Sequence, residues 1–199
     1  MSISRTHVLV AAAAAVLFAA GCSDDSTTTH TTEHSTTTAT GAAASTDFND
    51  ADVSFLQMMY PHHAQAVEMA KMVPSHTQNQ QLIALAAQVE KAQAPEMQQI
   101  TDLLAGFGKP APSATEGHGG HDMPGMMTDA QMSSLQAANG ADFDQQWLEM
   151  MIAHHEGAVG MAQTELNAGV NPQTRQLATT IVADQEAEIA TMRGMLGQN

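Results

Sequence analysis

The chain has 199 residues, enough for one domain with additional segments. Its formal net charge is −15, with 21 Asp and Glu residues against 6 Lys and Arg residues. This balance argues against a nucleic-acid partner, because phosphate backbones are bound by clustered basic side chains. Cys22 is the only cysteine, so the sequence excludes a disulfide framework and a cysteine-based metal site or nucleophile.

Residues 1–21 have the layout of a secretory signal peptide. Arg5 and His7 give a weakly basic start, and the apolar run at residues 8–18 is too short to span a bilayer as a stable helix. The small residues 19–21 lead into Cys22, an order that resembles a bacterial lipobox, in which cleavage leaves the cysteine as a lipidated N-terminus. We therefore predict an exported protein, lipid-anchored at Cys22 to the outer face of the cell membrane or in the periplasm. An ordinary signal peptide cut elsewhere is the alternative.

Residues 22–46 are rich in Ser, Thr and Asp and contain almost no large apolar side chain. Such a segment cannot bury enough apolar surface to fold, so its composition predicts a disordered tether. His30 and His34 lie four residues apart in this tract, where the polar surroundings favour solvated histidines over a binding site.

The pattern of residues 47–199 predicts only helices. Apolar residues recur at a spacing of ~3.6, and no alternating strand pattern occurs. Short connections predict two pairs of antiparallel neighbours. A short helix capped by Thr128 and Gln131 is expected between the pairs. The long helices are expected at about 48–73 before Pro74, about 77–105 with a Thr77/Gln80 capping box, about 142–169 from Asp142, and from Asn171-Pro172 onward.

The two helix pairs contain the same sequence element. Residues 55–69 and 147–161 share Met-Met-x-x-His-His, and the offset of 92 residues (154 minus 62) also aligns Gln93 and Glu96 with Gln185 and Glu188. A repeat of this length indicates a duplicated supersecondary unit. We therefore predict an all-α, up-down four-helix bundle made of repeat one at 47–106 and repeat two at 142–199, joined by a central linker at 107–141.

A helical wheel at ~100° per residue places both histidine pairs within the apolar arc of their helices. Adjacent histidines project ~100° apart, so the two members of a pair are not expected to bind the same ion. The water-facing side of the first helix holds Gln57, Ala64, Gln65, Glu68 and Lys71. The core-facing sets of the two repeats are Met58, Met59, His62, His63 and Met69, and Met150, Met151, His154, His155 and Met161.

The second helix of each pair turns a carboxylate inward. Gln93 and Glu96 face the core on the wheel, as Gln185 and Glu188 do in the second repeat. A buried carboxylate is unfavourable unless it is paired, protonated or bound to a metal. One interpretation is a hydrogen bond to each Glu from a histidine of the partner helix. The other, which we favour for four inward histidines and two inward Glu, is a metal site inside the bundle.

The methionines and the central linker bear on the choice of metal. Thioether and imidazole together form a soft ligand set that suits copper, especially Cu(I), and suits Mg, Ca or Mn poorly. Ordinary core packing is the alternative explanation for the methionines. The linker adds Met and His in a stretch too rich in Gly and Pro to pack as core, which predicts metal capture rather than a plain linker. These linker residues are His118, His121, Met123, Met126 and Met127.

Two prolines set the repeats apart, since Pro61 and Pro95 correspond to Ala153 and Ala187. A proline inside a helix costs ~3 kcal/mol and kinks or breaks it. Both prolines lie beside the candidate ligands, so we expect the first repeat to be locally distorted there.

The doubled Met-Met-x-x-His-His element with its downstream Gln-x-x-Glu resembles the family catalogued as domain of unknown function 305 (DUF305), over about residues 48–197. The resemblance implies a ferritin-like four-helix bundle that is often exported. Some members are implicated in periplasmic copper binding and resistance, with Met and His as ligands. By position, this implies as ligands the same ten Met and His residues that the wheel turns toward the core.

The expected function is therefore an extracytoplasmic, membrane-anchored protein that binds copper, as Cu(I) or Cu(II), and sequesters it or hands it on. Glu96 and Glu188 complete the candidate metal site, and a homo-oligomer or a delivery partner is left open. One alternative is a ferritin-like metal oxidase, although the Glu-x-x-His spacing of di-iron bundles is absent. The other is a structural lipoprotein whose His–Glu pairs only hold the bundle in register.

Overall fold

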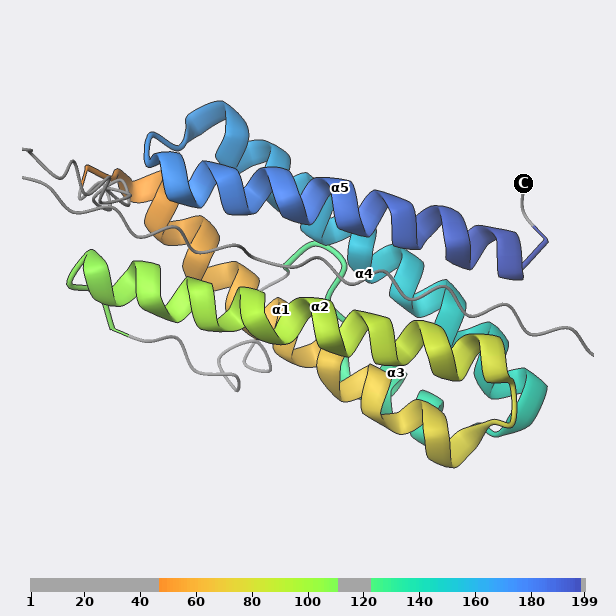
Figure 1. Cartoon of the computed structure of the whole chain (residues 1–199). Coiled ribbons are helices and arrows are strands. Elements are labelled where there is room, and N and C mark those ends of the chain that lie inside the picture. The colour runs from red at the N-terminus through yellow and green to blue at the C-terminus, as the bar shows by residue number, and fades with distance from the viewer. Residues whose placement is uncertain (1–46, 111–122, 198–199) are drawn as a thin grey trace, which may run out of the picture. The chain divides into compact units, whose positions relative to one another are not determined.

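The computed structural model describes residues 47–110 and 123–197. These stretches contain no strand and five helices: α1 Asp50–His76, α2 Gln80–Gly106, α3 Asp129–Ala137, α4 Gly140–Ala168 and α5 Pro172–Met195 (Figure 1). The predicted all-α class is confirmed. The predicted signal peptide and tether, with Cys22, His30 and His34, lie outside the described residues. None of the helices in the described stretches is both long and apolar enough to cross a membrane.

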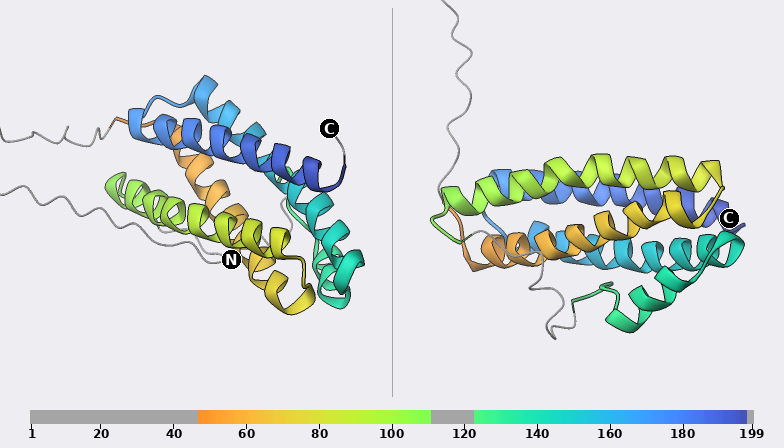
Figure 2. Two further views of the ribbon diagram at one scale, coloured as in Figure 1. Left: turned by 45° about the vertical axis from the view of Figure 1, so that its right-hand side comes forward. Right: turned by 90° about the horizontal axis from the view of Figure 1, so that it is seen from below.

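The four long helices form two antiparallel hairpins, α1 with α2 and α4 with α5, as predicted for a four-helix bundle. The hairpins join mainly through α1 and α4, which lie in one layer while α2 and α5 lie in the other (Figure 2). The buried indole of Trp147 on α4 donates its N–H to the carbonyl of Met69 on α1 at 2.9 Å. The short helix α3 packs against α4.

Capping residues, rather than the nearest proline, set the ends of the helices. α1 continues through Pro74 to His76, so its predicted end at residue 73 is wrong. α2 begins after Asn79, whose side chain accepts hydrogen bonds from the amides of Gln81 and Leu82. Asn79 therefore takes the place of the predicted capping box of Thr77. Asn79 stands closer to the apolar run than Thr77 and is at least as good an N-cap.

The other helix starts agree more closely with the predictions. The capping box of Thr128 and Gln131 on α3 is confirmed. Asn171 caps α5 and Pro172 occupies its first position, as predicted. α4 begins two residues before the predicted Asp142, at Gly140.

Neither Pro61 nor Pro95 interrupts its helix, so the expected local distortion of the first repeat does not include a break in α1 or α2. Pro61 is buried in α1, where packing on both sides of it holds the helix together, and Pro95 lies on the exposed side of α2. At the buried Pro61, tertiary contacts therefore outweigh the unfavourable energy of a proline inside a helix.

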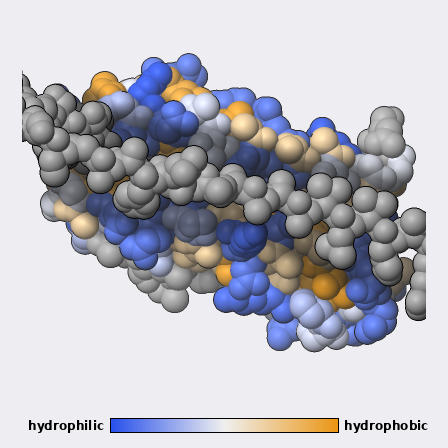
Figure 3. Space-filling model, in the orientation of Figure 1, coloured by the Kyte–Doolittle hydropathy of each residue, from blue (hydrophilic) through white to orange (hydrophobic). Residues whose placement is uncertain are grey.

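A polar layer divides the core into two apolar clusters. One cluster joins residues 66–73 of α1 and 82–89 of α2 to residues 143–151 of α4 and to Ile189 and Met192 of α5. The other joins residues 53–59, 100–107, 158–162 and 177–181 of the same four helices. Between the clusters, all four helices place polar side chains inside the bundle. The outer face formed by α2 and α5 is mainly hydrophilic, with small separate apolar spots (Figure 3).

Two buried acids connect the hairpins at one end of the bundle. Asp52 of α1 is fully buried and accepts backbone hydrogen bonds from Asn49 at 2.8 Å, Asn171 at 2.9 Å and Val170 at 3.2 Å. Burial alone would raise the pKa of Asp52, but these hydrogen bonds outweigh it and hold the pKa below its usual value. The neighbouring Glu165 of α4 has its pKa raised to about 8 by burial and by the hydrogen bond and charge of Asp52. At neutral pH the pair therefore shares one proton, carried by Glu165.

This shared proton predicts how stability depends on pH. Unfolded Glu165 loses its proton near its ordinary pKa of 4.5, whereas the folded protein retains it to about 8, so rising pH across this window favours unfolding. Glu165→Gln keeps the shape of the side chain but cannot ionise. In the wild type we expect the free energy of unfolding to fall by a few kcal/mol between pH 5 and 9, and we expect this fall to be absent in the variant. Urea unfolding of both proteins across this range measures the difference. The control is Glu68→Gln, on the exposed side of α1, whose stability should fall with pH as that of the wild type does. An equal fall in all three proteins would contradict the assignment of the proton to Glu165.

Candidate functional site

Four fully buried histidines form the centre of the polar layer. His62, His63, His154 and His155 have no exposed surface, so their predicted inward orientation is confirmed. The rings of His62 on α1 and His154 on α4 lie 3.7 Å apart between centroids, with their planes tilted by 37°. The interface between the two hairpins is thus made by imidazole against imidazole, while His63 and His155 turn toward α2 and α5.

Each of these outer histidines pairs with a Glu of the neighbouring helix. The Nε2 of His63 lies 2.8 Å from Glu96, and the Nε2 of His155 lies 2.6 Å from Glu188. A carboxylate accepts, so Nε2 of each ring is the donor, and Nδ1 is the nitrogen that this contact leaves over. The hydrogen-bond interpretation of the inward carboxylates is therefore correct. It is also compatible with a metal site, since metal-binding histidines usually donate their other N–H to a carboxylate.

The central histidines are neutral. Burial lowers the pKa of His62 to about 3, with a contribution from neighbouring His63, and only partly offset by its hydrogen bond to Pro124. Burial, together with His62 and His155, also holds the pKa of His154 well below its ordinary value, and the backbone of His62 offsets this only in part. Neutral imidazole keeps a lone pair, which is the form that binds a metal ion.

The layer contains more buried polar atoms than it has hydrogen-bond partners. In the described part of the chain, nine buried nitrogen and oxygen atoms of the layer lack a partner of proper geometry. An unpartnered buried polar group costs roughly 1–3 kcal/mol, so such a concentration indicates a site that binds something. These atoms are Nδ1 of His62, His63 and His155, both ring nitrogens of His154, and both amide atoms of Gln93 and Gln185.

Four of the predicted methionines flank this layer. Met59 and Met161 are buried in one apolar cluster, and Met69 and Met151 are buried in the other. Of these four methionines, each cluster therefore holds one from each repeat. Met58 is 38% exposed, contrary to its predicted core position, because it lies at the edge of the apolar arc where no helix covers it. Its counterpart Met150 is only partly buried.

The central linker does pack where the structure describes it. His118 and His121 lie outside the described residues, and Met123 and Met126 are partly buried. Met127 is 8% exposed and belongs to an apolar cluster, so the expectation that this stretch cannot pack as core is wrong there. Gln65, predicted to face water, is 2% exposed because its amide is hydrogen-bonded to the backbone of Met127.

Nitrogen and oxygen ligands alone do not form a metal site in the described residues. No group of three or more His, Cys, Asp or Glu side chains is arranged there to hold an ion. Asp184, which the sequence did not single out, lies near Glu96 and Glu188; burial raises its pKa, and the two charges add to the shift. A metal in the layer would therefore need thioether ligands as well as imidazole.

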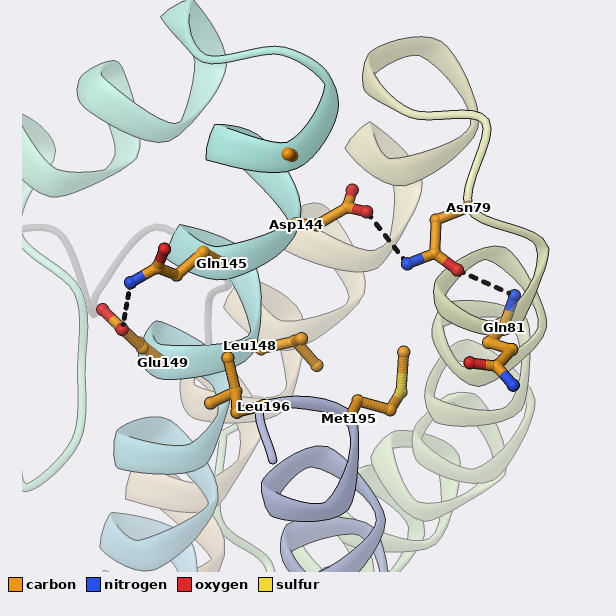
Figure 4. Close-up of a pocket in the computed structure, with 9 residues that line it drawn as sticks. Asn79, Gln81, Asp144, Gln145, Leu148, Glu149, Met195 and Leu196 are labelled. Atoms are coloured by element: carbon orange, nitrogen blue, oxygen red, sulfur yellow. Dashed lines mark hydrogen bonds between the residues drawn. The ribbon is translucent and has the colours of Figure 1, made fainter. Parts of the chain in front are cut away.

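A pocket of about 430 Å³ lies away from this layer, near the start of α4 (Figure 4). On one side Asn79 donates to Asp144 at 2.9 Å, and on the other Gln145 donates to Glu149 at 2.9 Å. Leu148, Met195 and Leu196 line the apolar part of the wall, and Gln81 and Ala141 also line the pocket. The Asn79–Asp144 contact corresponds, at the 92-residue offset (171 minus 79), to the contact of Asn171 with Asp52 at the other end of the bundle.

Comparisons with known proteins agree with this architecture. The family model described as Domain of unknown function (DUF305) matches residues 52–196. A DUF305 protein of Streptomyces coelicolor, described as secreted, is 32% identical, with a TM-score of 0.67 over 74% of this chain and 93% of that chain. A DUF305 fragment of Deinococcus radiodurans is 33% identical, with a TM-score of 0.67 over 76% of this chain and 98% of the fragment.

A third solved structure is that of CopM in its Cu(II)-bound form, which is 32% identical, with a TM-score of 0.64 over 72% of this chain and 94% of CopM. CopM is also known in Cu(I)-bound and Ag-bound forms. An uncharacterized protein of Acanthamoeba polyphaga mimivirus is 38% identical over 55 residues, which are 28% of this chain. That match spans only about a third (36%) of the viral protein.

The unpartnered amides of the layer lead to a stability prediction for the metal-free protein. Replacing Gln93 and Gln185 by Leu removes buried polar atoms that have no partner, so we expect each change to raise the free energy of unfolding by roughly 1–3 kcal/mol. Urea unfolding in the presence of a chelator measures this. Gln65→Leu is the matched control, because it removes an equally buried amide that makes two hydrogen bonds, and it should destabilise. Destabilisation by all three changes would show that the layer amides are satisfied.

Proposed function

Because the chain belongs to the DUF305 family, we propose that it is an exported protein that binds copper in the polar layer of its bundle. The observation that carries this proposal is the set of buried, neutral, unpartnered imidazole nitrogens between two pairs of buried methionines. These nitrogen atoms have no hydrogen-bond partner in the described chain, so their lone pairs are available to a metal ion.

In this proposal, the neighbouring rings of His62 and His154 supply the central nitrogens. Buried thioethers on either side complete the ligand set, from Met59 and Met161 in one cluster or from Met69 and Met151 in the other. His63 and His155 can bind through Nδ1. Glu96 and Glu188 then orient these two rings from outside, rather than binding the ion as first expected.

The donor set favours copper, particularly Cu(I), over harder ions. Thioethers bind soft ions, and Zn, Mg or Ca sites are built mainly from nitrogen, thiolate or oxygen donors. In the described residues no group of three or more His, Cys, Asp or Glu side chains is arranged to hold an ion. CopM, a relative of similar fold, has Cu(I)-, Cu(II)- and Ag-bound forms, which supports a soft-metal role here.

The remaining candidate ligands and the expected location of the protein complete the proposal. Met58 and Met150 at the edge of the bundle, with Met123 and Met126 of the linker, would collect the ion, as would His118 and His121. Lipidation at Cys22 would hold the protein on a membrane face, where it would sequester copper or hand it on. The signal-like residues 1–21 and the secreted relative support export.

The alternative is a structural lipoprotein whose His–Glu pairs only hold the bundle in register. One observation favours this structural alternative, because both His–Glu pairs form without a metal. It predicts that the histidines contribute to stability and not to binding. The central pair separates the two alternatives, since His62 and His154 do not take part in the His–Glu contacts.

Copper titration tests the proposed function. We expect purified protein to bind Cu(I) more tightly than micromolar in a competition assay with a chromogenic chelator. The double variant His62→Leu/His154→Leu should lose at least about 10-fold in affinity, the lower end for a disturbed metal site. It should keep most of its stability, because three of the four ring nitrogens that it removes have no partner, and only the hydrogen bond from Nε2 of His62 to the Pro124 carbonyl is lost.

The matched control is His76→Leu, a histidine at the end of α1 that bonds to the carbonyls of Met72 and Gln136. Its copper affinity should equal that of the wild type. Wild-type affinity weaker than micromolar would refute the proposal, and unchanged affinity with lowered stability in the double variant would favour the structural alternative.

A further inference from the structure

One backbone segment closes the outer side of the central histidine pair. This segment, Met123–Thr128, is called the strap below. Its Pro124 carbonyl lies 3.1 Å from Nε2 of His62. One turn further along α1, Gln65 holds the strap with two hydrogen bonds, accepting from the amide of Met127 at 2.7 Å and donating to the carbonyl of the same residue at 2.9 Å.

The strap also lies directly on α4, beside His154. A Cβ added to Gly157 would lie 2.1 Å from the carbonyl oxygen of Pro124. A Cβ added to Gly125 would lie 2.7 Å from the carbonyl of Ala153 and 2.8 Å from that of His154, and Gly125 has a φ of +80°. Glycine is thus required on both sides of this contact. The close approach fixes the Pro124 carbonyl in position over the histidine pair.

The contact with Pro124 decides which nitrogen of His62 carries the proton. A backbone carbonyl can only accept, so Nε2 must donate and the lone pair of the ring must be on Nδ1. The ring is fully buried, and Nδ1 has no other partner in the described chain. His154, at the same position of the second repeat, has neither ring nitrogen fixed in this way.

We propose that the strap is a positioning element of the metal site, which holds His62 in the Nε2–H tautomer so that this ring binds through Nδ1 alone. This inference rests on the proposed function for its metal-binding consequence, but the tautomer itself belongs to the metal-free protein. Within the described residues, the strap contacts a ring nitrogen of His62 and none of His154, so His62 has a fixed donor atom while His154 can bind through either nitrogen. The central pair is therefore asymmetric.

A pair of glycine substitutions on α4 tests the proposal. Gly157→Ala places a methyl group against the Pro124 carbonyl and must displace the strap. Gly160→Ala is the matched control, because the same change three residues later meets no heavy atom within 4 Å. Both variants gain the same helix propensity, so they differ only in the contact with the strap.

The first measurement is made without metal. Long-range ¹H–¹⁵N NMR spectra of the histidine rings report the tautomer of each ring. We expect Nε2–H at His62 in the wild type and in Gly160→Ala, and a shift toward Nδ1–H or a mixture in Gly157→Ala. If Gly157→Ala does not fold, Gln65→Leu releases the strap by removing two hydrogen bonds without adding atoms on α4. Nδ1–H in the wild type, or an unchanged tautomer in the displaced-strap variant, overturns the proposal.

The second measurement is the affinity for Cu(I). Loss of a group that orients a metal ligand typically lowers affinity 10- to 100-fold, and we expect a loss in this range for Gly157→Ala and none for Gly160→Ala. If no protein in the series binds copper, the proposed function fails, while the tautomer result still decides whether the strap positions His62. Equal copper affinity in both glycine variants, with binding intact, overturns the positioning role.

Discussion

The constraint on which the rest of the structure depends is the desolvation of imidazole and amide groups in the middle of a helical bundle. An ordinary bundle of this size would fill that cross-section with apolar side chains. Here all four long helices contribute polar groups, and the apolar core is confined to a cluster above and a cluster below. Burial keeps His62 and His154 neutral, and neutrality leaves their lone pairs available. The same desolvation that makes the layer unfavourable for folding makes it suitable for a ligand.

A layer of this kind requires that the bundle be held together elsewhere. Hydrogen bonds that join the hairpins lie toward the ends, where Asp52 accepts amides from the α4–α5 connection and Asn79 of the α1–α2 connection donates to Asp144. Trp147 adds a buried bond to the backbone of α1. The central histidines, by contrast, touch each other without a hydrogen bond between their rings. Stability and binding are thus assigned to different cross-sections, so a ligand can occupy the centre without replacing the contacts that join the hairpins.

Helical periodicity predicted the parts of this arrangement that depend on one helix at a time. The inward orientation of the histidine pairs, Gln93 and Glu96 follows from spacing alone, and their burial agrees. What spacing could not predict are contacts made by a different segment. Gln65 lies on the side of α1 that would face water, and it is buried because the backbone of Met127 covers it. Pro61 remains helical because packing around it outweighs its own preference. The glycine at 157 carried a usable signal, since a small residue inside a helix often marks a close approach of another backbone.

The connectivity of the chain accounts for the asymmetry of the central pair. Two identical hairpins from separate chains would meet at an exact twofold axis, and every contact of one histidine would have its copy at the other. Joining the hairpins in one chain introduces a linker that has no partner copy, and this linker can lie against only one of the two matched positions. It binds the Nε2–H of His62 and leaves His154 free. A duplicated bundle therefore gains two different donors from one repeated histidine. The difference comes from the segment between the repeats and from one matched position beside it, which is Gln65 in the first repeat and Gly157 in the second.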